Sequence, residues 1–393
     1  MRDIFMVAAV RTAIGTFGGT LKAKTPGELG ALVVQTAVER ARVDPQVVGH
    51  VVFGQVMPTA PEDVYLARVA GVNAGLPHAT PALTVNRLCG SGLQAVISAA
   101  QMIMLGDCEV AVAGGAEVMS AVPFHAPDVR WGRKMGNSTL VDALDHALRD
   151  PFGRMAMGVT AENLAARHSI SREEQDALAV ESHRRAAAAI DAGYFREQIV
   201  PVEVASRRGV ERFDTDEQVK RDTSPEALAR LKAIFKPEGG TVTAGNASGI
   251  NDGAAAVVLA SGAAVKEHGL VPMARLVGYG HAGVDPAYMG YGPVPATESV
   301  LAKTGRSIGD LDVIEANEAF AAQALAVSRS LDLDPAKVNP NGSGISLGHP
   351  VGATGAIIVT KLVHELRRTR GRYGLTTMCI GGGQGISAIW ERA

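Results

Sequence analysis

Aromatic side chains, cysteine and an excess of either charge are all scarce in this sequence of 393 residues. Aromatic residues make up only 4% of the chain, so an interior built from its 47% hydrophobic residues must be mainly aliphatic. The formal net charge is −2, which gives no overall positive field for nucleic acid or for an anionic membrane surface. Any anionic ligand would therefore have to find local positive charge.

Motifs for several common chemistries are also missing. Three cysteines are too few, and odd in number, for a disulfide framework, and they lack the paired spacing of a zinc site. The sequence has no GxGxxG, P-loop or HExxH pattern, which disfavours dinucleotide binding, nucleotide hydrolysis and zinc hydrolysis. We therefore predict no metal and no permanently bound cofactor, and reactive thiols remain open.

Long hydrophobic runs are also scarce in the sequence. No apolar run is expected to span a membrane, and residues 1–7 lack the uninterrupted apolar core of a signal peptide. We expect a cytoplasmic protein with neither a membrane nor a nucleic acid as partner.

Apolar runs alternate with helical patterns at both ends of the chain. This alternation predicts an α/β fold whose sheet is mixed, mainly parallel and covered by helices on both faces. Strands are expected at Ile4–Val10, His50–Gly54, Ala82–Val85, Glu109–Ala116, Ile250–Ala260 and Arg275–Gly280, and helices at Pro26–Arg42, Asp63–Ala74 and Leu93–Leu105.

Residues 119–249 have a different texture. Arg130–Lys134 is part of a basic, irregular stretch, and Ser171–Ala192 is typical of an alanine-rich helix that opens with a capping box. We predict an inserted loop domain here. It would separate an N-terminal lobe (residues 1–118 and 250–270) from a C-terminal lobe (residues 271–393).

An internal repeat links these two lobes. Asn86–Gly92 is echoed by Asn339–Gly344, and both precede long apolar helices. The strand that ends at Gly115 is echoed by Leu375–Gly383. We infer two duplicated α/β lobes whose loops meet at one site.

Cys89 lies on a glycine-rich turn between a predicted buried strand and an apolar helix. The N–H groups and partial positive charge of a helix N-terminus lower the pKa of a thiol, which would favour the nucleophilic thiolate. From this turn alone, a nucleophile and a small buried packing residue both remain open.

The second lobe offers further polar candidates. His349, between glycines and before a helix, is either a base for the Cys89 thiol or a packing group. Cys379 precedes a glycine run in which Gly381 can present an N–H to an oxyanion, or it is a core cysteine. Asn317 either positions water or a carbonyl, or belongs to a polar helix cap. Cys108 is predicted to be structural.

These motifs, taken in order, resemble those of the thiolases, the acetyl-CoA acyltransferases that make or cleave β-ketoacyl-CoA. The resemblance covers nearly the whole chain and rests on Asn86–Gly92, Asn317–Phe320, Asn339–Gly355 and Cys379–Gly385. It implies a thiolase-like fold with coenzyme A and acyl-CoA as substrates.

The resemblance also implies roles for the candidate residues. Cys89, activated by His349, would carry the acyl group as a thioester, and Cys379 would act as acid and base at the α-carbon. One oxyanion site would use His349 and a water held by Asn317. The other would use the backbone N–H groups of Cys89 and Gly381.

Ligand-binding residues follow from the same resemblance. Met289 and Phe320 match positions that shape the acyl pocket, where Ala156 replaces the histidine of biosynthetic relatives and predicts a wider, less polar pocket. Lys220 or Arg221 would replace an arginine beside the adenine. The positions matched around the pantetheine arm are Met157, Phe235, Ala244 and Ser248.

The segment Arg130–Lys134 falls where such bacterial enzymes have a tetramerisation loop, so a homotetramer is expected. Three other functions remain as alternatives. A decarboxylating condensing enzyme and a thiol-dependent hydrolase would leave Cys379 without a task. An inactive lipid-binding protein of this fold would need neither cysteine.

Overall fold

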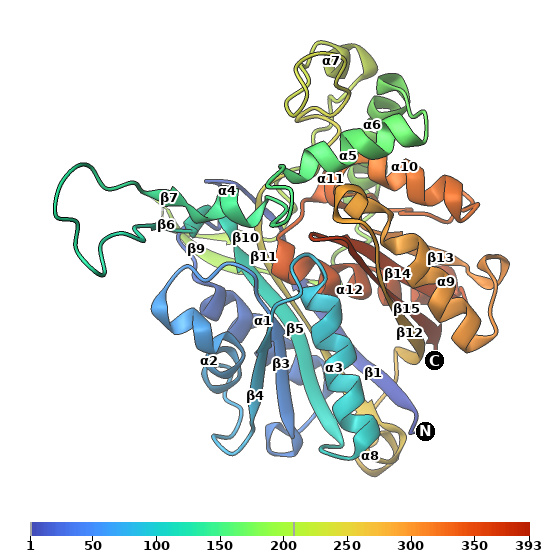
Figure 1. The fold of residues 1–393 in the computed structure, drawn as a ribbon. Helices are drawn as coiled ribbons and strands as arrows, with labels where there is room; N and C mark the ends of the chain where they lie inside the picture. Colours follow the sequence, from blue (N-terminus) through green and yellow to red (C-terminus); the bar gives the residue numbers. More distant parts are fainter. Residues whose placement is uncertain (1, 207–208) are drawn as a thin grey trace.

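The computed structural model describes residues 2–206 and 209–393 and has an α/β architecture (Figure 1). The first lobe contains β1 (Ile4–Thr12), β2 (Gly15–Thr16), β3 (His50–Gly54), β4 (Ala82–Val85), β5 (Val110–Val118), β11 (Asn251–Ser261), α1 (Pro26–Ala41), α2 (Leu66–Asn73), α3 (Ser91–Leu105) and α8 (Gly262–Glu267). The second lobe contains β12 (Ala274–Gly283), β13 (Val313–Ala316), β14 (Tyr373–Ile380), β15 (Gln384–Arg392), α9 (Pro293–Thr304), α10 (Ala321–Ser330), α11 (Gly344–Leu347) and α12 (Val351–Thr369).

A middle segment lies between β5 and β11 in the chain. Its elements are β6 (Phe124–His125), β7 (Val141–Asp142), α4 (Ala143–Ala147), α5 (Met157–Arg167), α6 (Arg172–Asp191), β8 (Ile199–Val200), β9 (Val202–Ser206), β10 (Gly209–Phe213) and α7 (Pro225–Ala229). Short 3₁₀ helices are η1 (Pro45–Val47), η2 (Pro61–Tyr65), η3 (Met119–Ala121), η4 (Pro286–Tyr291) and η5 (Ile308–Asp310).

The two lobes repeat one strand order. In the first lobe the order is β4-β3-β5-β11-β1, with parallel pairs up to β5 and antiparallel pairs from there on. The second lobe has β13-β14-β15-β12 with the same directions, and Val338 pairs with Ile314 where β4 stands in the first lobe. The duplication read from the sequence is confirmed.

The sheet is mixed, as expected, but its centre is antiparallel. β1 and β12 join the lobes through antiparallel pairs at Phe5 and Met6, and the neighbouring pairs out to β5 and β14 are antiparallel as well. The expectation of mainly parallel pairing therefore holds only at the two outer ends of the sheet. In each lobe the last strand in the chain to join the common pattern, β11 or β15, runs antiparallel to both of its neighbours in the sheet.

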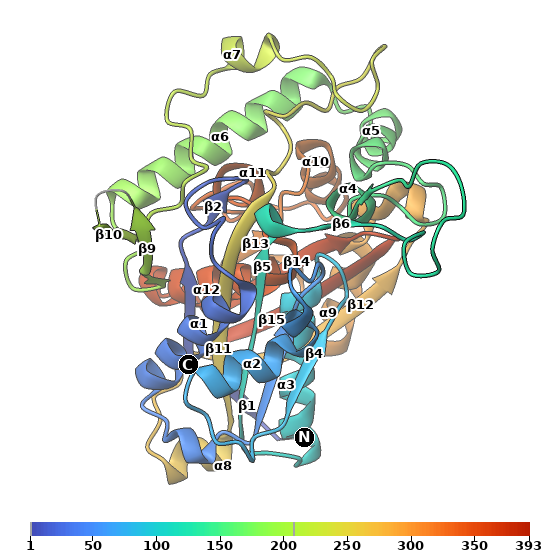
Figure 2. The same cartoon turned by 90° about the vertical axis from the view of Figure 1, so that its left-hand side faces the viewer.

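Helices and sheet form successive layers (Figures 1 and 2). One core packs α1 and α2 on the outer face of the first lobe, and another packs α9 and α10 on the outer face of the second. Between the lobes, α3 and α12 share a core with strands of both. The two helices that follow Cys89 and His349 are thus the buried centre of the molecule.

One expectation about burial is wrong. Strand β4 forms where predicted, but it lies at an edge of the sheet, so Leu83 is 40% exposed. The stretch Leu88–Leu105 is long and apolar enough, by length and composition alone, to span a membrane. In the structure it forms α3, whose side chains Leu93, Val96 and Ile97 are fully buried between the lobes.

The middle segment covers one end of the sheet. Helices α5, α6 and α7 gather there, while the chain between β6 and β7 projects as an arm (Figures 1 and 2). Helix α6 opens with the predicted capping box, in which Ser171 and Glu174 satisfy each other's backbone N–H groups.

Candidate active site

Cys89 lies on a tight turn directly before α3. Leu88 has a φ of 45°, and its N–H donates to Oδ1 of Asn86. The Ser91 hydroxyl accepts from the Arg87 N–H and donates to the Leu88 carbonyl. Because these contacts fix the turn on both sides of the cysteine, its sulfur has a defined direction.

The turn also touches the second lobe. A Cβ at Gly90 would come within 2.6 Å of the Ile380 side chain, so glycine permits this approach without a shift of that side chain. Ile380 follows Cys379, and the charge of Cys89 contributes to raising the pKa of Cys379. The structure therefore brings the two predicted cysteines together.

Burial, rather than the helix N-terminus, dominates the electrostatics of Cys89. Desolvation raises the pKa of its thiol to about 11, while hydrogen bonds from the backbone N–H groups of Gly381 and Cys89 lower it. The expectation of a resting thiolate is therefore wrong. Those two N–H groups are the donors that the resemblance assigned to one of the oxyanion sites.

His349 is buried in a fixed tautomer. Its Nδ1 lies 2.7 Å from the Thr354 hydroxyl, which donates its own proton to the Pro350 carbonyl. The hydroxyl must therefore accept from Nδ1–H, which leaves a lone pair on Nε2. Burial lowers the pKa of His349 to about 4, so the ring is a neutral base at physiological pH.

Asn317 lies beside that basic nitrogen. Its Nδ2 is 3.4 Å from Nε2 of His349, and its backbone N–H donates to the Thr377 carbonyl. Among the described residues, its buried Oδ1 has no hydrogen-bond partner. Such an oxygen is suited to hold a water molecule.

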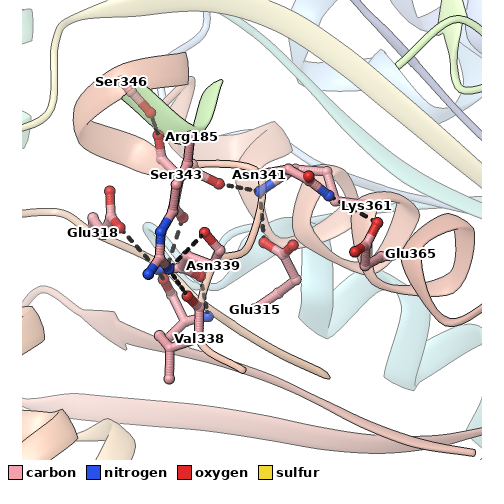
Figure 3. Close-up of polar contacts among 12 residues, drawn as sticks. Arg185, Glu315, Glu318, Val338, Asn339, Asn341, Ser343, Ser346, Lys361 and Glu365 are labelled. Atoms are coloured by element: carbon pink, nitrogen blue, oxygen red, sulfur yellow. Dashed lines mark hydrogen bonds and ion pairs between the residues drawn. The ribbon is translucent and has the colours of Figure 1, made fainter. Parts of the chain in front are cut away.

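A buried polar cluster that includes Glu318 and Asn339 (Figure 3) holds the backbone on both sides of Asn317. Asn339 makes two hydrogen bonds to the backbone of Ala316 and a third to the carboxylate of Glu318. Glu318 also accepts from the Ser182 hydroxyl of α6. The residues on both sides of Asn317 are thereby fixed.

One strand position earlier, a buried ion pair joins β13 to α12. Nζ of Lys361 lies 2.6 Å from the carboxylate of Glu315 and also donates to the Gly342 carbonyl (Figure 3). Breaking such a pair on one side leaves an uncompensated buried charge. The strand that leads into Asn317 is therefore tied to the helix that follows His349.

Cys379 is the second-last residue of β14 and is fully buried. Burial raises the pKa of its thiol beyond the ordinary range. The turn that follows has left-handed backbone at Gly382 (φ 78°) and Gly383 (φ 82°), which favours glycine. This turn leads directly into β15 and places the Gly381 N–H at the site.

A cavity of about 430 Å³ opens onto these groups. Asn317 and Cys379 lie behind its wall, in contact with residues that line it. The predicted residues that line the cavity are Cys89, Ala156, Met157, Phe235, Ala244, Ser248, Met289, Phe320, His349 and Gly381.

Lys220 and Arg221 are not brought to this cavity in the described part of the chain. The Arg221 guanidinium is paired with Asp191 at 2.9 Å. The backbone N–H of Lys220 donates to His183, whose pKa falls to about 4 through burial and the charge of Lys220.

Sequence reasoning missed several residues that shape the site. Thr354 fixes the tautomer of His349 and lies five residues after it, within the quoted motif. Asn251 accepts the His349 N–H through its Oδ1, and no local pattern marks it. Within residues 2–206 and 209–393, no three His, Cys, Asp or Glu side chains are grouped to hold a metal.

Family comparisons agree with this geometry. The model of the thiolase N-terminal domain matches residues 4–263, and that of the thiolase C-terminal domain matches residues 270–392. The chain therefore belongs to the thiolase family and is an acyltransferase with the thiolase fold.

Individual relatives are similar over their full length. The chain is 63% identical over 391 residues to the beta-ketothiolase BktB of Cupriavidus necator, covering 100% of this chain and 99% of that protein. It is 51% identical over 394 residues to the acetyl-CoA acetyltransferase of Pseudomonas aeruginosa, covering both completely. The crystal structure of human mitochondrial 3-ketoacyl-CoA thiolase in complex with CoA superimposes with a TM-score of 0.97 at 47% identity, covering 100% of this chain and 98% of that one.

Proposed function

We propose that this thiolase joins acyl-CoA to acetyl-CoA, and cleaves 3-ketoacyl-CoA in the reverse direction, through an acyl group carried on Cys89. The observation that carries this proposal is that Cys89 and the neutral His349 line one cavity, with Cys379 packed directly behind its wall. Catalysis at a single nucleophile explains both directions, and metabolite ratios decide between them.

In the cleaving direction, Nε2 of His349 takes the proton of the Cys89 thiol. The sulfur attacks the 3-keto carbon of the substrate, and the bond between C2 and C3 breaks. The electron pair of that bond becomes the enolate of acetyl-CoA. Cys379 donates its proton to the enolate carbon, which leaves a thioester on Cys89 and a thiolate at Cys379.

Coenzyme A then completes the cycle. The Cys379 thiolate takes the proton of the incoming CoA thiol, and the CoA sulfur attacks the thioester carbon. Cys89 leaves as a thiolate and recovers its proton from His349, so all three groups return to their starting states.

The protonation of His349 serves a second purpose. Once Nε2 carries the proton of Cys89, it becomes a donor and can support an oxyanion together with a water held by Asn317. The backbone N–H groups of Cys89 and Gly381 support the other oxyanion. Losing one donor of this kind costs about 3 kcal/mol of transition-state stabilisation in comparable enzymes.

Coenzyme A is proposed as substrate, with no permanently bound cofactor. Its pantetheine arm would lie along Met157, Phe235, Ala244 and Ser248, which line the cavity. Its nucleotide would lie outside, with Lys220 or Arg221 as the proposed contact. We also propose that residues 119–249 form an inserted domain and that the protein is cytoplasmic.

The acyl pocket is expected to accept chains longer than acetyl. Ala156 lines the cavity at the point where α5 begins, so a histidine there would add volume and polarity. Thiolysis of 3-ketohexanoyl-CoA should therefore be at least as fast as that of acetoacetyl-CoA. Ala156→His should slow the longer substrate about tenfold relative to the shorter one, since a lost methylene contact is worth about 1–3 kcal/mol.

Ala156→Ser is the matched control, because it adds polarity with little volume. The measurement is the steady-state rate of thiolysis of each substrate by the unmodified enzyme and by both variants. Faster cleavage of acetoacetyl-CoA by the unmodified enzyme would contradict the wide pocket.

The projecting arm supports the proposed homotetramer. Trp131 and Met135 are each 89% exposed on it, which is unusual for large apolar side chains on a free surface. Trp131→Ser combined with Met135→Ser should shift the sedimenting species from tetramer to dimer without loss of folding. Leu105→Ser, at an 81% exposed position outside the arm, is the control. An unchanged mass for the double variant would refute a role for the arm.

The test of the activity itself is incubation with 3-ketoacyl-CoA and CoA while the enolate absorbance is followed. A thiolase consumes the signal only when CoA is present. A hydrolase would need no CoA, a decarboxylating enzyme would release carbon dioxide from a malonyl-type donor, and a lipid-binding protein would show no turnover.

A further inference from the structure

A buried carboxyl group at the junction of the two lobes belongs to a residue that the mechanism does not use. Glu117 lies at the end of β5 and is fully buried. Its carboxylate accepts the N–H groups of Val56 and Met57, both at 3.0 Å, and of Gly352 at 2.9 Å. Two of these donors belong to the first lobe and the third to the second lobe.

The donor from the second lobe is in the first turn of α12. Pro350, the N-cap of this helix, has no side-chain oxygen to satisfy the N–H groups that begin the helix. An acidic side chain near a helix N-terminus is favourable both as an acceptor and against the helix dipole. Glu117 therefore provides, from the other lobe, the cap that α12 lacks.

The two active-site helices cross without side chains between them. A Cβ on Gly92 of α3 would lie 2.7 Å from the Ala356 nitrogen of α12, and a Cβ on Gly355 would collide with the Leu93 nitrogen. At this crossing the carboxylate of Glu117 occupies the space beside Gly352, where a Cβ would come within 2.5 Å of it.

Two of the three donors, Val56 and Met57, line the active-site cavity, and the third, Gly352, directly follows a residue that lines it. Val56, Met57, Val351 and His349 all line the cavity beside Cys89. A shift of the Glu117 carboxylate would therefore move both the first-lobe wall and the start of α12, which directly follows His349. A displacement of about 1 Å can cost about 10²-fold in rate.

We propose that Glu117 is a positioning residue that joins the lobes by capping α12, and so sets the place of the His349 base relative to Cys89. This inference rests on the proposed roles of Cys89 and His349. When it is ionised, Glu117 also contributes, after the larger effect of desolvation, to disfavouring the Cys89 thiolate.

The test uses Glu117→Gln, which keeps the shape of the side chain. An amide has one acceptor oxygen and an NH₂ group, so it leaves at least one of the three N–H groups without an acceptor. We expect kcat to fall about tenfold or more, with the KM for CoA within about twofold. Removal of the negative charge should at the same time make Cys89 more reactive.

The second readout is alkylation of Cys89 by iodoacetamide, followed by peptide mass mapping. Burial raises the pKa of Glu117 to about 8, so the measurement belongs at about pH 9, where its charge is present. The variant should react about threefold faster or more than the unmodified enzyme. The other titratable groups around these two side chains, His349, Cys379 and Asp63, are unchanged in the variant.

Gly352→Ala provides an independent approach from the helix side. Alanine favours the helix by about 1 kcal/mol, yet its Cβ would collide with the carboxylate. It should also lower kcat, which keeps the inference testable even if Glu117→Gln fails to fold.

Glu365→Gln is the matched control on the same helix. Its buried carboxylate accepts from Asn341 and pairs with Arg368, away from the cavity. It should lower the melting temperature but leave turnover and Cys89 alkylation unchanged. The inference is overturned if Glu117→Gln and Gly352→Ala keep full kcat, or if turnover and alkylation fall in parallel with thermal stability. Failure of Cys89→Ala to abolish activity would instead refute the proposed nucleophile.

Discussion

Cys89→Ala is expected to lower turnover by about 10⁴-fold or more in both directions, because no other group at the cavity can hold the acyl chain as a thioester. The turn that carries Cys89 is fixed by its own backbone and by Ser91, so alanine should leave the fold intact. Steady-state thiolysis of a 3-ketoacyl-CoA measures the effect.

Cys108→Ala is the matched control for that experiment. Cys108 is buried, and burial and the charges of Asp107 and Glu109 raise its pKa to about 11, but it does not line the cavity in the described residues. It should keep nearly full activity. A Cys89→Ala enzyme with more than about a hundredth of the normal rate would show that the acyl group is carried elsewhere.

Cys379→Ala is expected to separate the two half-reactions. The enolate that leaves the carbon–carbon bond is a far stronger base than the CoA thiolate, so its departure depends much more on a proton donor. Condensation and thiolysis should fall by about 10²- to 10⁴-fold. Exchange of labelled CoA into acetyl-CoA, which breaks no carbon–carbon bond, should fall much less.

The exchange assay and the thiolysis assay are run on the same preparation, so that a partly unfolded variant lowers both alike. Equal losses in the two assays would mean either that Cys379 is only a packing residue or that it acts equally in both half-reactions. Full thiolysis by Cys379→Ala would remove it from the mechanism.

Local patterns in the sequence predicted much of the fold. The expected strand His50–Gly54 coincides with β3, and the capping box at Ser171 opens α6. Such features depend on residues close together in the chain, where periodicity and capping chemistry are visible. The repeat of Asn86–Gly92 was sufficient to predict two similar lobes, which the repeated strand order confirms.

Features that depend on distant residues could not be predicted in this way. Apolar alternation gives no direction to a strand, so the antiparallel centre of the sheet was missed. The same pattern suits an edge strand and a buried one, which explains the error at Leu83.

The active site shows the same limit. The position of Cys89 before a helix is visible in the sequence, but its desolvation by the second lobe is not, and desolvation decides the direction of its pKa shift. Thr354 acts on His349 through a direct hydrogen bond, and Glu117 acts through the first turn of α12. Neither contact can be recognised before the fold is known. The motifs therefore predict the reacting groups, whereas the structure is needed to assign their protonation states.

The proposed acyl-Cys89 intermediate is tested most directly by mass spectrometry of the enzyme mixed with butanoyl-CoA in the absence of acetyl-CoA. We expect one butanoyl group per chain on the peptide that contains Cys89, lost on addition of CoA and absent from Cys89→Ala. A butanoyl group on the Cys379 or Cys108 peptide of the unmodified enzyme, or an adduct that persists in Cys89→Ala, would contradict the assignment.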